Sequence, residues 1–233
     1  MKRYAAALLA LALTVSACNG SDRKDTKITV FAAASLTKAF GEEATAYEKK
    51  HKGTDVVLSF AGSQSLVAQI QQGAPADVLA TADQATMDKV AGQLKQPSQV
   101  FAHNQLAIVT APGNPQHLAS LTDLTQSGLR VVLAGPTVPV GKAAAKALAA
   151  AGVRLKPVSL EDAVTGVVGK VRLGEADAGI AYVTDLGDGV DGVPLTGTTT
   201  SLAIGPLTSG GEGFVAFVLS AEGQAILTKY RFQ

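Results

Sequence analysis

The chain contains little of what metal centres and disulfide frameworks require. It has one cysteine, Cys18, no tryptophan, and three histidines among 233 residues. A single cysteine excludes an intramolecular disulfide, and His51, His103 and His117 lack the spacing that zinc and iron–sulfur sites need. No Walker loop, nucleophile elbow or His-Glu-x-x-His motif occurs either. We therefore expect neither a cofactor nor an enzyme.

Charge of a single sign is equally scarce. The formal net charge is +1, and 47% of the residues are apolar. Such a chain can bury a sizeable core, and it has no electrostatic reason to bind nucleic acid. Beyond the N-terminal segment, no apolar run is long enough to span a bilayer. We expect a globular monomer without a nucleic-acid partner.

The N-terminal segment has the features of an export signal. Met1-Lys2-Arg3 precedes an apolar run over residues 4–15 and the small-residue ending Val15-Ser16-Ala17-Cys18, which is the order found in signal peptides. The ending resembles a bacterial lipobox, in which the cysteine is lipidated. We expect a signal peptide over residues 1–17, a lipidated Cys18 with a tether over residues 18–26, and an extracytoplasmic protein anchored to the bacterial cell membrane, in a periplasm or on the outer face of the cytoplasmic membrane. The alternative is an ordinary signal peptide with an incidental cysteine.

The rest of the chain alternates short valine-, isoleucine- and alanine-rich runs with helical patterns. This alternation predicts an α/β protein with mainly parallel sheets. The expected strands are residues 28–34, 56–60, 77–80, 105–110, 130–134, 178–183, 193–195 and 202–207. The expected helices are residues 36–50, 65–72, 84–91, 141–151, 161–173, 214–218 and 222–230. Two comparable sets of elements predict two lobes with a cleft between them, with residues 27–104 in lobe I, 105–200 in lobe II and 201–233 returning to lobe I.

Small or polar residues stand where several predicted strands end and helices begin. Ser35 and Ser63 follow the first two strands, and residues 137–141 and 159–162 open two helices of the second set. Each helix start carries about half a positive charge on unpaired N–H groups, so four starts facing one cleft would match a dianion. The alternative is that both serines serve only as helix N-caps.

At these residues the sequence resembles the molybdate-binding proteins of bacterial ABC importers. The resemblance extends over nearly the whole mature chain and rests on the order and spacing of several segments. They are Val30-Phe31-Ala32-Ala33-Ala34-Ser35-Leu36, Phe60-Ala61-Gly62-Ser63, Gly73-Ala74-Pro75-Ala76-Asp77-Val78, Val138-Pro139-Val140-Gly141 and Gly174-Glu175-Ala176-Asp177-Ala178-Gly179-Ile180-Ala181-Tyr182. Two departures are an extra residue after Glu161-Asp162 and the absence of a glycine between Tyr230 and Phe232.

The resemblance implies a two-lobed periplasmic-binding-protein fold of type II and a site for a tetrahedral oxyanion, molybdate or tungstate. Its ligand-binding residues would be two serines, two backbone amides and one tyrosine: Ser35, Ser63, Val140, Val164 and Tyr182. Counting forward from Glu161-Asp162 gives Ala163 in place of Val164, so that choice stays open. Tyr182 could also be an ordinary strand-end tyrosine. The partners implied are an ABC permease and its ATPase.

A site made only of hydrogen-bond donors would satisfy a fully deprotonated dianion and leave the proton of hydrogen phosphate without an acceptor. We therefore expect phosphate to be rejected, and Glu161 and Asp162 to point to solvent. A sulfate- or thiosulfate-binding protein of the same fold is the nearest alternative. A serine hydrolase using Ser35 or Ser63, and a lipoprotein with a purely structural role, are the alternatives from other classes.

Overall fold

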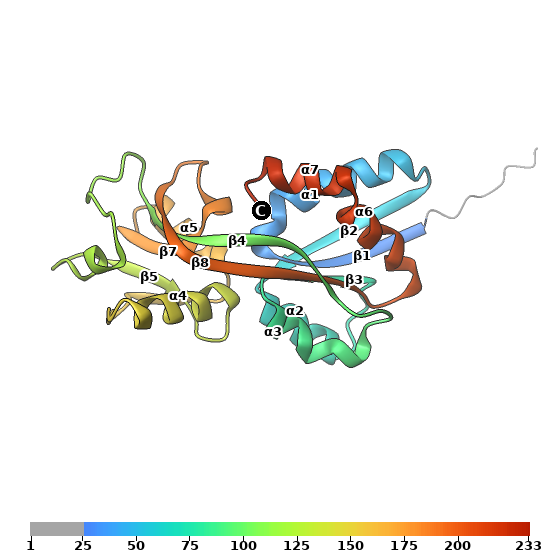
Figure 1. Cartoon of the computed structure of the whole chain (residues 1–233), viewed down its shortest axis with the longest axis horizontal. Coiled ribbons are helices and arrows are strands. Elements are labelled where there is room, and N and C mark those ends of the chain that lie inside the picture. The colour runs from blue at the N-terminus through green and yellow to red at the C-terminus, as the bar shows by residue number, and fades with distance from the viewer. Residues whose placement is uncertain (1–25) are drawn as a thin grey trace, which may run out of the picture.

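A computed structural model describes residues 26–233, and the predicted signal peptide, Cys18 and nearly all of the tether lie outside these residues. Within them, one sheet of eight strands runs through the molecule in the order β2-β1-β3-β8-β4-β7-β5-β6 (Figure 1). The strands are β1 (Thr26–Ala33), β2 (Thr54–Ala61), β3 (Val78–Thr81), β4 (Gln99–Thr110), β5 (Val131–Ala134), β6 (Ser159–Glu161), β7 (Ala178–Tyr182) and β8 (Asp191–Pro206). No helix in residues 26–233 is long and apolar enough to cross a membrane.

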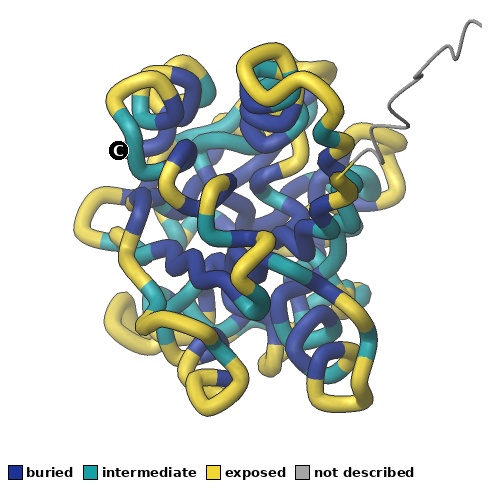
Figure 2. Tube along the Cα trace, turned by 90° about the vertical axis from the view of Figure 1, so that its right-hand side faces the viewer, coloured by how far each residue is buried: buried dark blue, intermediate teal, exposed yellow. Residues whose placement is uncertain are grey.

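Helices follow most of the strands and cover the sheet. The α-helices are α1 (Thr37–Lys50), α2 (Ser63–Gln71), α3 (Gln84–Met87), α4 (Pro139–Ala150), α5 (Val164–Arg172), α6 (Glu212–Leu219) and α7 (Ala221–Lys229). Short 3₁₀ helices are η1 (Ala34–Leu36), η2 (Asp88–Gln93), η3 (Leu121–Thr125), η4 (Val183–Asp185) and η5 (Ser209–Gly211). Buried segments lie in the interior and exposed turns at the periphery, as the tube in Figure 2 shows.

The sheet is parallel on its two flanks and antiparallel in its centre. β1 pairs in parallel with β2 and β3, and β5 pairs in parallel with β6 and β7. The central pairs β3–β8, β4–β8 and β4–β7 are antiparallel. The parallel arrangement expected from the buried, apolar strands therefore describes the flanks, where every residue of β3 and β7 is buried.

Apolar side chains gather into separate cores at the two ends of the sheet. One end, called lobe I here, contains β1–β3, α1–α3, α6 and α7. The other, lobe II, contains β5–β7, α4 and α5. β4 and β8 contribute to both cores and run between the lobes (Figure 1). The boundaries expected after residues 104 and 200 fall within these two strands and stay a prediction.

Two sequence-based expectations about local structure were wrong. Residues 191–206 form the single long strand β8, although the glycine- and threonine-rich stretch up to residue 200 predicted mostly loop. Glycine at position 192 allows β8 to pair closely with β4, because a Cβ on Gly192 would lie 2.3 Å from the carbonyl oxygen of Ile108. The helix expected from residue 161 begins at Val164, since Ser159–Glu161 pair with β5 as a strand too short to give a pattern of its own.

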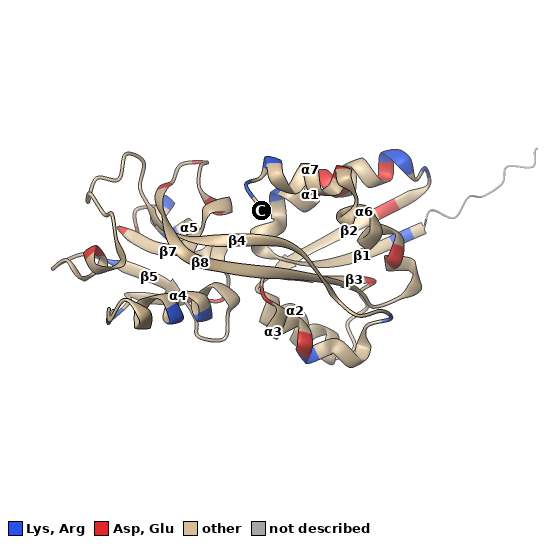
Figure 3. Ribbon diagram, in the orientation of Figure 1, with Lys and Arg blue, Asp and Glu red and all other residues tan. Residues whose placement is uncertain are grey.

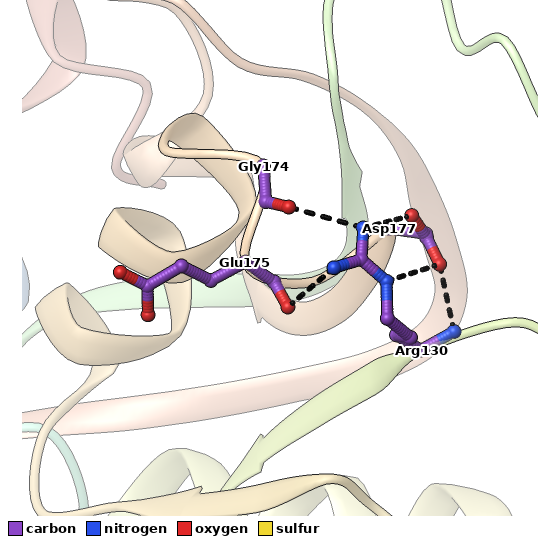
Figure 4. A network of polar contacts seen from close by, with 4 residues as sticks. All are labelled: Arg130, Gly174, Glu175 and Asp177. Atoms are coloured by element: carbon purple, nitrogen blue, oxygen red, sulfur yellow. Dashed lines mark hydrogen bonds and ion pairs between the residues drawn. The ribbon is translucent and has the colours of Figure 1, made fainter.

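The turn between α5 and β7 is fixed by an arginine from the start of β5 (Figure 4). Arg130 donates to both carboxylate oxygens of Asp177, from Nη2 at 2.7 Å and from Nε at 3.2 Å. The guanidinium also donates to the carbonyl oxygens of Gly174 and Glu175. This ion pair lowers the pKa of the Asp177 carboxyl. The Gly-Glu-Ala-Asp segment is therefore structural and does not line the cavity described next.

Candidate functional site

A small cavity lies where the two lobes meet. The space open to the centres of water-sized spheres is about 20 Å³, slightly more than one water molecule requires. Its lining comes from both lobes: Ala33, Ala34, Ser35, Gly62, Ser63, Ala82, Val138, Pro139, Val140, Val164 and Tyr182. The structure thus brings together the five residues that the sequence analysis named. Sugars, amino acids and peptides are too large for such a space.

Four helix starts converge on the cavity, each following a parallel strand within five residues. The residues preceding the helices are Ala33 before η1, Gly62 before α2, Val138 before α4 and Ala163 before α5, and none of them makes a side-chain capping bond. The first N–H groups of these helices therefore have no side-chain acceptor at the cap position, although capping residues usually satisfy them. The arrangement concentrates positive partial charge without a lysine or arginine.

The alternative that both serines serve only as helix N-caps was wrong. Ser35 lies within η1, which leads into α1, and Ser63 is the first residue of α2 rather than the residue before it. The cap positions fall on Ala33, two residues before Ser35, and on Gly62, one residue before Ser63, and neither has a side-chain oxygen. The serine hydroxyls are therefore available for a different role.

Three hydroxyl groups from both lobes meet at the cavity. The oxygens of Ser35 and Tyr182 are buried and have no hydrogen-bond partner, a condition that typically costs about 1–3 kcal/mol for each group. The Ser63 oxygen accepts a bond of 3.1 Å from the backbone N–H of Ala82. Since its acceptor side is occupied, the Ser63 hydroxyl hydrogen is free to be donated.

Tyr182 ends β7 and is 2% exposed. Burial is the main cause of a raised pKa for its hydroxyl, the carboxylates of Asp185 and Asp83 raise that pKa further, and the nearby Thr200 side chain partly offsets the rise. The phenol consequently stays protonated at neutral pH and can act as a donor. The lining contains no carboxylate, histidine, lysine or arginine, so it offers hydroxyls, backbone groups and apolar surface but no charged side chain.

The acidic residues before α5 stay away from the cavity. Asp162 is exposed, as expected. Glu161 instead is half-buried, accepts a bond of 2.8 Å from the Ser159 hydroxyl and lies 3.9 Å from the Lys170 ammonium. No group of three or more acidic, histidine or cysteine side chains within residues 26–233 could hold a metal ion.

Counting along α5 left two candidates for one backbone donor. Val164 is the first residue of α5 and lines the cavity, whereas Ala163 precedes the helix and does not. The geometry therefore favours Val164. Ala82 escaped the sequence analysis, although it follows the third strand as a small residue in the same way that Ala34 follows the first. Its amide holds the Ser63 hydroxyl in place.

A small cavity between two lobes joined by long strands is the arrangement of a solute-binding protein. The chain belongs to the bacterial extracellular solute-binding protein family, whose profile matches residues 28–233. The molybdate-binding protein ModA of Mycobacterium tuberculosis (strain ATCC 25618 / H37Rv) is 48% identical over 160 residues, 68% of this chain and 61% of that protein. The match therefore spans less than two thirds of that relative's length. ModA of Escherichia coli (strain K12) is 37% identical over 186 residues, 75% of this chain and 72% of that protein.

Solved structures show the same fold. The periplasmic molybdate-binding protein of Azotobacter vinelandii superposes with a TM-score of 0.78 at 19% identity, covering 88% of this chain and 98% of that one. The sulfate-binding protein SubI of Mycobacterium tuberculosis H37Rv superposes with a TM-score of 0.75 at 17% identity, covering 89% of this chain and 86% of that one. The fold alone thus does not separate the two oxyanions.

Proposed function

We propose that this protein captures molybdate, and equally tungstate, outside the cytoplasm and delivers it to an ABC permease with its ATPase. The observation that carries the proposal is the pair of unpartnered buried hydroxyls, Ser35 and Tyr182, in a cavity that also receives the free Ser63 hydroxyl. A tetrahedral oxyanion supplies the acceptors that these donors lack. The ModA relatives at 48% and 37% identity support molybdate as that oxyanion.

In the proposed complex, lobe I donates from the hydroxyls of Ser35 and Ser63. Lobe II donates from the backbone amides of Val140 and Val164 and from the Tyr182 hydroxyl. Helix starts add favourable electrostatics without a counter-ion. Hydrogen phosphate would place its proton where no acceptor lines the cavity, at a typical cost of about 1–3 kcal/mol. The protein acts as a monomeric carrier and performs no chemistry on its ligand.

The proposal includes the membrane anchor. Cys18 and the residues before it carry the lipobox-like ending, and we propose that lipidation at Cys18 ties the folded lobes to the cell surface. A globomycin-sensitive mobility shift of the expressed precursor, abolished by Cys18→Ala, is the expected result. An unchanged mobility in both forms would leave an ordinary signal peptide.

Sulfate is the second candidate, because it also is a dianion with acceptors only. A sulfate-binding protein of Synechococcus elongatus is 28% identical over 158 residues, 59% of this chain and 45% of that protein. That relationship is weaker than those to the ModA proteins. A serine hydrolase has less support still, since neither Ser35 nor Ser63 has a base among its neighbours in the cavity.

Thermal unfolding with molybdate, tungstate, sulfate and phosphate separates these possibilities. A ligand at a hundredfold excess over its Kd stabilises the folded state by about 2.7 kcal/mol. We expect stabilisation by molybdate and tungstate and none by phosphate. Equal stabilisation by sulfate would reassign the ligand. No shift with any oxyanion would contradict the proposal and favour a structural role.

A further inference from the structure

The lobes touch each other directly beside the cavity, through groups that do not line it. Gln64, in the first turn of α2, donates from Nε2 to the backbone oxygen of Asp162 at 2.8 Å. This bond crosses from lobe I to lobe II. Gln64 follows Ser63 in the chain, and Asp162 stands two residues before Val164. The contact therefore joins the two segments that place a hydroxyl and an amide at opposite walls of the cavity.

A second direct contact joins α4 of lobe II to the start of α3 in lobe I. The ammonium of Lys142 lies 3.3 Å from the Asp83 carboxylate and 3.1 Å from the Thr86 hydroxyl. Lys142 stands two residues after Val140, and Asp83 follows Ala82, whose amide holds Ser63. This bond likewise ties together two segments that form the cavity.

A third contact between the lobes, the ion pair of Lys38 and Asp188, contributes less. Lys38 and Asp188 meet with side chains that are 51% and 66% exposed. Lys142 and Asp83 are 35% and 21% exposed. Because water and salt screen exposed pairs, contacts such as Lys38–Asp188 typically contribute little or nothing measurable. The two contacts beside the cavity are therefore the ones that matter.

Gly62 decides how closely the lobes approach at this point. Its φ is −60° and its ψ is 134°, a conformation that any residue adopts. The backbone thus does not require glycine here. A Cβ at this position would lie 2.3 Å from the Asp162 oxygen and 2.6 Å from Gln64 Nε2, closer than real Cβ contacts allow. Glycine is needed because the other lobe passes against it.

We infer that Gly62, Gln64, Asp83, Lys142 and the Asp162 carbonyl form a clasp that holds the lobes closed and sets how long the captured anion is retained. The clasp bonds need no ligand atom, so they favour the closed arrangement even in the empty protein. Whatever binds in the closed cavity then gains affinity in proportion to the closed population. The identity of the anion rests on the proposed function, whereas the closure itself does not.

Gly62→Ala tests the clasp, with Gly169→Ala as its control. Gly169 lies in α5, and a Cβ there would meet nothing within 4 Å. Both variants should keep the far-ultraviolet circular dichroism of the parent. Spin labels on cysteines that replace exposed Lys89 in lobe I and exposed Ala149 in lobe II report the interlobe distance. The labelled protein begins at residue 18 and carries Cys18→Ser, so that no other cysteine reacts.

We expect Gly62→Ala to lengthen the ligand-free interlobe distance and to raise the molybdate dissociation rate by about tenfold or more, with a smaller change in the association rate. Gly169→Ala should match the parent in both measurements. An unchanged distance in folded Gly62→Ala would overturn the inference. If no oxyanion binds the parent, a longer distance in Gly62→Ala still supports the clasp while the proposed function fails.

A second pair of variants tests the polar half of the clasp. Lys142→Met removes the cross-lobe ammonium, and Lys146→Met removes the same charge one turn later in α4, where no ion pair is formed. Lys142→Met should speed molybdate dissociation by about two- to fivefold, and Lys146→Met should not. Equal effects of the two variants would show a general loss of positive charge and would contradict the role of Lys142.

Discussion

The two lobes have the same strand arrangement, but different residue types from each lobe line the cavity. Outward from the central pair, lobe I has β3, β1 and β2, and lobe II has β7, β5 and β6. In each lobe, the helix starts after its two outer strands face the cavity. Ser35 and Ser63 line the cavity from lobe I, whereas Val140, Val164 and, at the end of β7, Tyr182 line it from lobe II. Substitution can remove a side-chain donor but not a backbone donor. In the proposed site, mutations in lobe I should therefore lower affinity more than mutations in lobe II, even if both lobes contribute equally to binding.

A matched difference occurs where the third strand of each lobe begins. Asp77 before β3 accepts from the Thr29 amide at 2.8 Å and from the Thr208 hydroxyl at 2.6 Å. Asp177 before β7 accepts from the Arg130 amide and the Arg130 guanidinium. An aspartate at the equivalent position thus fixes the equivalent turn in each lobe. Its partners are neutral groups in lobe I and include a charged guanidinium in lobe II. The fold constrains the position of the carboxylate more tightly than the identity of its partner.

The largest expected effect comes from a difference between the helices that follow β1 and β5. Helix α1 buries a carboxyl group, whereas α4 carries lysines and no acidic residue (Figure 3). Glu43 is fully buried with both oxygens unpartnered, and burial raises its pKa to about 8. The folded state therefore binds a proton that the unfolded state releases near pH 4.5. Stability should fall as pH rises from that value through 8, by at most about 5 kcal/mol.

Glu43→Gln should remove this dependence and leave a protein more stable than the parent above pH 8. Urea unfolding at several pH values measures it. Glu42→Gln is the control, since Glu42 pairs with Lys229 and Tyr230 and its pKa is lowered mainly by the Lys229 bond. The Glu42→Gln substitution should change stability in the opposite direction: it should destabilise the protein at neutral pH and leave its stability at acid pH unchanged. Parallel pH curves for the parent and Glu43→Gln would show that Glu43 does not titrate in this range.

Ser63→Ala should give the largest loss of affinity on the hydroxyl wall. The change removes one donor to a charged ligand and leaves the Ala82 amide without its acceptor. Hydrogen bonds to charged groups contribute about 1.5–3 kcal/mol, so Kd should rise by about a hundredfold in isothermal titration. The lost Ala82 bond lowers stability in the free and bound protein alike, but it also orients the Ser63 hydroxyl before binding. The Ser35 hydroxyl has no such partner, so Ser35→Ala should cost less affinity. A smaller loss for Ser63→Ala than for Ser35→Ala would contradict the supporting role of Ala82.

Tyr182→Phe tests the single side-chain donor of lobe II. Removing a buried hydroxyl without a partner should stabilise the ligand-free protein slightly, while Kd for the oxyanion rises by about tenfold. The two effects have opposite signs, which a merely structural tyrosine would not produce. Thermal unfolding without ligand and titration with molybdate measure them separately. Lower ligand-free stability together with unchanged affinity would assign Tyr182 to the core alone.

Much of this arrangement could be predicted from the sequence, because it depends on local patterns. The buried strands β1, β3 and β7 are nearly continuous apolar runs, and the serines follow β1 and β2 directly. β8 was predicted only as two short strands, residues 193–195 and 202–207, because glycine and threonine dominate the stretch between them and its pairing with β4 is a tertiary effect. The reason for Gly62 could not be found either, since the group it avoids is Asp162 of the other lobe. The sequence shows only that residue 62 is glycine, whereas the closed structure shows that the Asp162 carbonyl oxygen lies where a Cβ would be.

The smallest effect would sharpen the comparison between Asp77 and Asp177. Arg130→Met should lower stability slightly at low salt and much less at high salt, because an exposed ion pair is screened. Thr208→Val removes the corresponding partner of Asp77 and should cost the same at both salt concentrations, since a neutral hydroxyl is lost. Urea midpoints at low and high sodium chloride measure both. A salt-independent loss for Arg130→Met would mean that its bonds to the carbonyls of Gly174 and Glu175, rather than its charge, hold the turn of lobe II.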